Sequence, residues 1–112
     1  MSIQELREYH PNELIYEKGA LATHFYFVQQ GSVFAEVSGK RVSLNEGQVF
    51  GDGGMVSGQY KATVCAGPNG CKVLCMPFDD LKREIGRSPP LVKLFITNLL
   101  ARFEIAARLL EK

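Results

Sequence analysis

The sequence predicts a mainly β domain that ends in α-helices, and three features of the chain support this. Turn signals recur about every six to twelve residues along the first three-quarters of the 112-residue chain. The runs between these turns are rich in aromatic and β-branched residues, which pack well on a pleated sheet. After Pro77 the apolar residues recur instead at three- and four-residue steps, which is the period of an amphipathic helix. Short strands at this spacing favour a sandwich or barrel over βαβ units.

The expected strands are short and are bounded by glycine, proline or asparagine. They cover residues 5–10, 14–16, 24–29, 32–37, 41–44, 48–50, 61–66 and 71–76. We expect Gln30-Gly31 to separate the third strand from the fourth, and residues 67–70 to form a hairpin between the last two. Alternation then assigns four phenylalanines to the core and leaves Tyr26 on the opposite, exposed face: Phe25, Phe27, Phe34 and Phe50.

Two helices are expected after the strands. Pro77 precedes a short helix over residues 78–86, with Asp79 and Asp80 in the first turn, where the helix dipole favours negative charge. Pro89-Pro90 begins a longer helix over residues 90–111. This helix carries one continuous apolar stripe, which either packs against its own barrel or meets a partner helix: Leu91, Phe95, Leu99, Phe103, Ala106 and Leu110.

Composition restricts the class of protein. The length fits one domain, residues 1–112, and 46% apolar with 22% charged residues indicates a globular chain. Thirteen basic and twelve acidic residues give a net charge of +1, which disfavours direct nucleic-acid binding. No apolar run reaches the roughly 18 residues of a membrane span, and MSIQELREYH lacks the features of a signal peptide. A cytoplasmic location without membrane insertion is therefore expected.

The three cysteines are interpreted as reduced and mostly buried thiols, because an odd number cannot all pair. His10 and His24 lie far upstream without zinc-type spacing, so no metal site is expected. No His-x-His pair, nucleophile elbow, Walker motif or Rossmann motif is present. The sequence therefore predicts a protein that is not an enzyme.

The order of the turns resembles that of the cyclic nucleotide-binding domain family, which includes catabolite-activator-type regulators and kinase regulatory subunits. The resemblance covers about residues 9–110, and four segments carry it: Glu17-Lys18-Gly19, Gly31-Ser32-Val33, the stretch from Glu46-Gly47 to Phe50-Gly51, and Ala62-Thr63-Val64. It implies an eight-stranded, jelly-roll-like double-stranded β-helix barrel over about residues 4–76, followed by the two helices.

The resemblance also implies a ligand-binding cassette. In the family, a glycine-led turn directs backbone N–H groups at the cyclic phosphate, and an acidic residue after Phe-Gly accepts a hydrogen bond from the ribose. An arginine just before Ala-Thr-Val neutralises the phosphate. The matching residues here are Phe50, Gly51, Asp52, Gly53, Gly54, Tyr60, Lys61, Ala62 and Thr63.

The cassette departs from the family pattern at three points. Asp52 stands where glutamate is usual, and it either binds the ligand or caps a short helix over residues 53–55. Gly53 and Gly54 replace a Leu-Ala-type pair, so a more pliable turn is expected. The arginine is absent, and its place falls to Tyr60 or to Lys61, depending on the register.

Two functions follow from this resemblance. The first is a sensor or regulatory domain that binds cAMP or cGMP more weakly than is typical of the family, without any other cofactor. The second is a degenerate domain that binds no nucleotide and uses the helix over 91–111 for dimerisation or for docking onto a protein partner. The retained glycine turn and Asp52 favour the first function, and the missing arginine and the apolar helix favour the second.

Overall fold

The computed structural model describes residues 5–110, and within this range it describes the side chains through Arg102 except those of Val56 and Leu100. In chain order the elements are β1 (Glu5–Tyr9), β2 (Leu14–Tyr16), β3 (His24–Val37), β4 (Lys40–Asn45), β5 (Val49–Phe50), α1 (Gly54–Ser57), β6 (Thr63–Pro77), α2 (Phe78–Arg87) and α3 (Pro90–Leu110). The expected start of the barrel near residue 4 and the expected end of the last helix at residue 111 lie outside the described residues.

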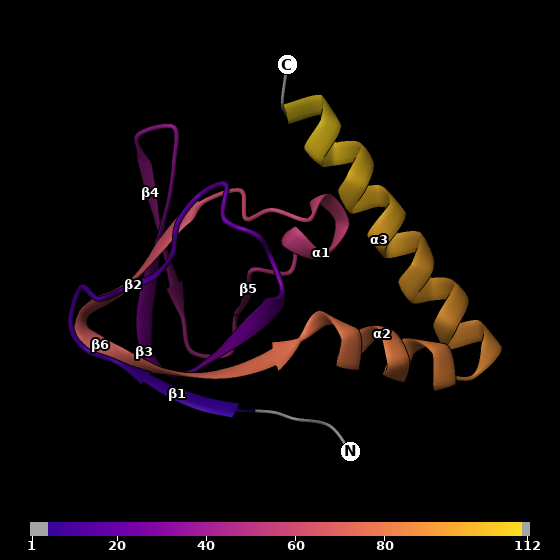
Figure 1. Cartoon of the computed structure of the whole chain (residues 1–112), viewed down its shortest axis with the longest axis horizontal. Coiled ribbons are helices and arrows are strands. Elements are labelled where there is room, and N and C mark those ends of the chain that lie inside the picture. Colours follow the sequence, from indigo (N-terminus) through magenta and orange to yellow (C-terminus); the bar gives the residue numbers. More distant parts are fainter. Residues whose placement is uncertain (1–4, 111–112) are drawn as a thin grey trace.

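The mainly β class with helices at the carboxyl end is confirmed, but the strand count is wrong. The described chain forms one six-stranded antiparallel sheet, not a closed eight-stranded barrel. The sheet order is β1-β6-β3-β4, with β2 also paired to β6 and β5 also paired to β3. Figure 1 shows the sheet curving around the core, with the helices beyond one end of it.

The number of strands differs because two of the breaks expected between strands do not occur. Residues 24–29 and 32–37 belong to the single strand β3, and residues 63–77 form the single strand β6 instead of two strands joined by a hairpin. β3 and β6 pair from His24–Pro77 to Glu36–Thr63, and the register shifts on both sides of Gly31. Glycine and its neighbours therefore produce bulges in a continuous ladder, a local effect that the sequence does not distinguish from a turn.

The predicted turn between residues 37 and 40 is confirmed. Ser38 and Gly39 both have positive φ, 52° and 78°, and Val37 pairs with Lys40 across them. This is the two-residue geometry that matches the twist of the flanking strands.

The buried face of the aromatic segment, residues 24–29, is the opposite of the one expected. Tyr26 is 5% exposed and belongs to the core, whereas Phe27 is 36% exposed. Phe25 is half-buried and stacks on Phe78 of α2, with ring centroids 6.2 Å apart. Phe34 is also only half-buried, while Phe50 is in the core as predicted. Alternation gives two faces but does not say which of them points inward.

The cysteines are free, as predicted, and two of the three are buried. Burial raises the pKa of the Cys71 and Cys75 thiols, and the charge of Glu13 raises that of Cys71 further. Both thiols are therefore protonated at neutral pH.

The helices follow the predicted boundaries closely. α2 carries Asp79 and Asp80 in its first turn, and Asp80 is buried and paired with Arg83 at 3.1 Å. α3 contacts α2 and α1, and Figure 1 shows it extending past α1. No helix among residues 5–110 is long and apolar enough to cross a membrane.

Candidate ligand-binding hollow

The expected cassette surrounds a hollow of about 240 Å³ between the β5–α1 turn and the start of β6. Eight of the nine cassette residues line it: Phe50, Gly51, Asp52, Gly53, Gly54, Tyr60, Lys61 and Ala62. The ninth, Thr63, lines a separate hollow of about 120 Å³, and its Oγ1 accepts a hydrogen bond from the Lys18 N–H at 3.1 Å. Two segments of chain that are separated in sequence therefore meet around one hollow.

Stacked aromatic rings form one wall of this hollow. The rings of Tyr16 and Tyr60 lie face to face with centroids 3.7 Å apart, and those of Tyr26 and Phe50 stack at 4.9 Å. Tyr16 also lies 6.2 Å from Phe50, so the four rings form one group, in which Tyr16, Phe50 and Tyr60 line the hollow and Tyr26 packs behind them. Burial raises the pKa of Tyr16, and the nearby groups Tyr60 and Asp52 add to this effect. The wall is therefore apolar and uncharged at neutral pH.

The sequence analysis did not identify Tyr16 as a site residue. It ends a strand of only three residues, β2, and lies outside the cassette residues that the resemblance implied. Its place in the wall depends on pairing with Val64 of β6, a contact between distant parts of the chain.

The hydroxyl of Tyr60 is bonded to the backbone of β3. It donates to the His24 carbonyl at 2.8 Å and accepts from the His24 N–H at 3.3 Å. The residue is 5% exposed, so its ring lines the hollow while its hydroxyl is used elsewhere. Of the two residues in the arginine's place, Lys61 is therefore the one with a side chain that can meet an anion in the hollow.

Two of the turn glycines are required by close packing. Gly51 has a φ of +81°, and a Cβ there would lie 3.2 Å from the ring of Tyr26. Gly54 is buried, and a Cβ there would meet the Ala22 Cβ at 2.5 Å. Gly53 is exposed, with nothing within 4 Å of such a Cβ. The expected pliability is thus restricted to Gly53, because Gly54 is packed against its neighbours.

The alternative of Asp52 as a helix cap is wrong. α1 begins at Gly54, its N-cap is Gly53, and no side chain caps it. The Asp52 carbonyl accepts from the Met55 N–H at 3.1 Å, and the Asp52 side chain is half-buried at the hollow.

Comparisons with known proteins agree with this geometry. A family model described as the cyclic nucleotide-binding domain matches residues 6–88. A putative potassium channel protein of Rhodopseudomonas palustris, RPA4233, is 24% identical over 97 residues, which are 83% of this chain and 24% of that protein. This chain therefore spans about a quarter of that relative.

Solved structures share the fold. The EAL enzyme Bd1971 in its half-site-occupied form superposes with a TM-score of 0.77 at 17% identity, covering 96% of this chain and 99% of that one. The catabolite activator protein of Thermus thermophilus gives 0.71 at 26% identity, covering 95% and 52%. PKAR CBD2 bound to Sp-2Cl-cAMPS gives 0.68 at 21% identity, covering 86% and 66%. The family model matches most of this chain, and the chain belongs to the cyclic nucleotide-binding domain family.

Proposed function

We propose that this chain is a non-enzymatic regulatory domain that binds cAMP or cGMP weakly in the hollow of its cassette. The observation that carries the proposal is that eight of nine cassette residues, from two separate segments, line one hollow. Neighbouring structures of Bd1971 include a cAMP-bound form and a cGMP-bound form, which supports this class of ligand.

Three groups at the hollow suit the parts of a cyclic nucleotide. The Lys61 ammonium meets the phosphate as a point charge. The Asp52 carboxylate accepts a hydrogen bond from the ribose hydroxyl. The Gly53 N–H, which donates to no other group within residues 5–110, is available to a phosphate oxygen.

The same geometry supports weak binding with little preference for one base. Lysine lacks the planar fork of arginine, and the loss of one charge-assisted phosphate bond lowers affinity by about 10- to 150-fold. The hollow of about 240 Å³ is smaller than the roughly 300–1,000 Å³ of sites that enclose a whole drug-sized ligand. We therefore expect the phosphate and ribose to be enclosed and the base to extend outside.

Isothermal titration calorimetry with cAMP and with cGMP tests this proposal. Wild-type protein should bind both with submillimolar affinity, and Lys61→Ala should weaken both by about 10-fold or more. Lys40→Ala is the matched control, because Lys40 is exposed and lies at the far end of β4. Millimolar or weaker affinity of wild type for both nucleotides would refute binding. An unchanged affinity in Lys61→Ala would refute the phosphate role of Lys61.

The outer face of α3 supports a second function, association with another protein or a second copy. Leu91 is 81% exposed, Phe95 65% and Leu94 59%, although all three belong to or border the predicted apolar stripe. Ile96, on another side of the helix, is half-buried. The described part of the stripe is thus not covered by the sheet, which argues against packing of this face on its own barrel. Phe103, Ala106 and Leu110 lie outside the described side chains.

Sedimentation velocity on the full chain tests this second function. If the chain dimerises through this face, the double variant Leu91→Ser/Phe95→Ser should be monomeric at a concentration where wild type is dimeric. Thr97→Asp serves as control, because Thr97 is exposed and does not belong to the stripe that contains Leu91 and Phe95. Equal sedimentation of the double variant and wild type would remove the dimer.

A further inference from the structure

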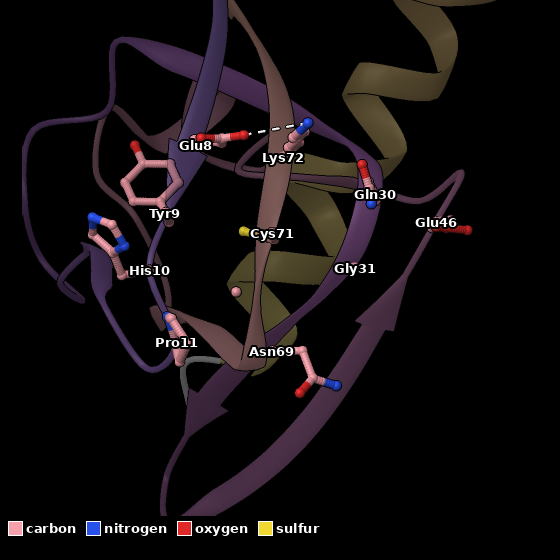
Figure 2. A pocket seen from close by; sticks show the side chains of 11 residues that line it. Glu8, Tyr9, His10, Pro11, Gln30, Gly31, Glu46, Asn69, Cys71 and Lys72 are labelled. Carbon is pink, nitrogen blue, oxygen red and sulfur yellow. Dashed lines mark ion pairs between the residues drawn. The ribbon is translucent and has the colours of Figure 1, made fainter.

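A hollow larger than that of the cassette lies elsewhere in the described chain. It has a volume of about 650 Å³, within the range of small-molecule sites. Its residues come from the end of β1, the middle of β3, the β4–β5 turn and the middle of β6, and it shares none of them with the cassette hollow. Figure 2 shows residues of the hollow on both sides of β6, with Tyr9 and His10 on one side, Gln30 and Glu46 on the other, and the Cys71 sulfur between them. The hollow thus forms independently of the features that define the family's cassette.

Backbone packing holds the floor of this hollow. Gly31 in β3 and Gly70 in β6 both have positive φ, +82° and +75°. A Cβ at Gly31 would lie 2.5 Å from the Gly70 carbonyl oxygen, and one at Gly70 would lie 2.7 Å from the Tyr9 carbonyl oxygen. Three strands therefore meet without side chains between them. Because the floor is backbone in close contact, it cannot collapse by a change of rotamer.

The charge of this hollow is negative. Two carboxylates and one ammonium line it, and the Lys72 Nζ lies 3.3 Å from the Glu8 carboxylate, as the dashed line in Figure 2 marks. Glu46, on the other side of β6 in Figure 2, makes no ion pair with any side chain that the structure describes. A third carboxylate, that of Glu13, accepts a hydrogen bond from the His10 N–H at 2.8 Å.

The Cys71 thiol is also influenced by a negative charge. Its pKa is raised by burial and then by the charge of Glu13. A neighbouring anion raises a thiol pKa because it opposes the formation of a second negative charge. The Cys71 thiol is therefore protonated and carries no charge, so the two carboxylates and one ammonium that line the hollow set its net negative charge.

We propose that this hollow is a second ligand site, separate from the cassette, and that it takes a small aliphatic molecule carrying a cationic amine. The ammonium would pair with Glu46, the one lining carboxylate without an ion pair. The amide oxygens of Gln30 and Asn69 supply further acceptors at the rim. The aliphatic chain would lie over the Cys71 thiol and the Pro11 ring.

The test is a titration followed by two-dimensional ¹H–¹⁵N NMR of the full chain, with three probes of equal chain length at constant ionic strength. Putrescine carries two ammonium groups, 1,4-butanediol is neutral and succinate is an anion. Putrescine should give saturable shifts at the amides of Gly31, Gly70 and Cys71, and the other two probes should give none. The absence of saturable shifts with putrescine would overturn the proposal, as would equal shifts with succinate.

Charge variants at Glu46 sharpen the test. Glu46→Gln should weaken putrescine binding, and Glu46→Lys should weaken it by about fivefold or more, because an attractive charge becomes a repulsive one. Glu17→Lys makes the same change of net charge at an exposed turn that lines neither hollow, and it should bind like wild type. Glu46 is exposed in a turn, so its variants are expected to fold, and the amide spectrum verifies this. Undiminished binding by both Glu46 variants would overturn the assignment.

Discussion

The wall of the cassette hollow and the outer face of α3 both carry large apolar side chains, but the chain covers only the first of them. Phe50 is 4% exposed and stacks on Tyr26, whereas Phe95 is 65% exposed in the middle of an apolar stripe. Phe50 pairs with Tyr26 of β3 and its ring contacts Tyr16 of β2, while Phe95 belongs to a helix whose main described contacts are with the short helices α1 and α2. Apolar periodicity marks a face that can be buried, and burial then depends on an opposing surface.

Replacing phenylalanine by alanine in the two regions should give the largest difference in the free energy of unfolding. Phe50→Ala removes a core ring and should lower the free energy of unfolding by about 3–5 kcal/mol. Phe95→Ala should change it by less than about 0.5 kcal/mol in the monomer, because its side chain is mostly in water already. Urea unfolding followed by circular dichroism measures both. Comparable losses in the two variants would show that α3 is packed in solution and would break the comparison.

Alanine substitutions at the two adjacent glycines of the cassette turn should change the stability in opposite directions. Gly54→Ala places a Cβ against Ala22 and should cost about 1–3 kcal/mol through overpacking. Gly53→Ala meets nothing within 4 Å at a φ of −60°, and it should stabilise the fold by about 0.4–1 kcal/mol by restricting the unfolded chain. Thermal unfolding of the two variants side by side checks this. Destabilisation by Gly53→Ala as large as that by Gly54→Ala would contradict the local packing described above.

Removing one hydroxyl from the wall should have a smaller effect. Tyr60→Phe keeps the stack on Tyr16 but leaves the N–H and carbonyl of His24 without this partner. We expect a loss of about 1–2 kcal/mol in the free energy of unfolding. Hydrogen exchange should accelerate at the His24 amide, and an unchanged exchange rate there would argue against the hydrogen bond.

Alkaline pH should give the smallest change in stability, through Tyr16 in the wall of the cassette hollow. Burial raises the pKa of Tyr16, so above about pH 10 the unfolded chain loses that proton while the folded chain keeps it. The free energy of unfolding is unaffected by this group below that pH and falls as the pH rises, by about 0.8 kcal/mol at pH 10.5. Tyr16→Phe should therefore lose that much less stability than wild type between pH 8 and pH 10.5. Equal losses in the two proteins would mean that Tyr16 ionises freely when folded.

The cassette could be predicted largely from the sequence because each of its two segments, residues 50–54 and 60–63, matches a motif of the family. Phe50 to Gly54 and Tyr60 to Ala62 line the hollow as the resemblance implied, and the choice between Tyr60 and Lys61 needed the hydrogen bonds to His24. Tyr16 could not be predicted, because it reaches the wall only through the pairing of β2 with β6. The sequence left open which way Thr63 faces, and in the structure Thr63 lines another hollow.

The sequence by itself determined the mainly β class with helices at the carboxyl end, the turn at Ser38-Gly39 and the family, because these depend on local conformational preference and on spacing. Only the tertiary structure decided which face of β3 is buried, whether Gly31 ends a strand or bends it, and that Gly54 must be small. These features depend on which atoms from distant segments lie opposite one another. Local preference contains no such information, so strand pairing and close packing had to supply it.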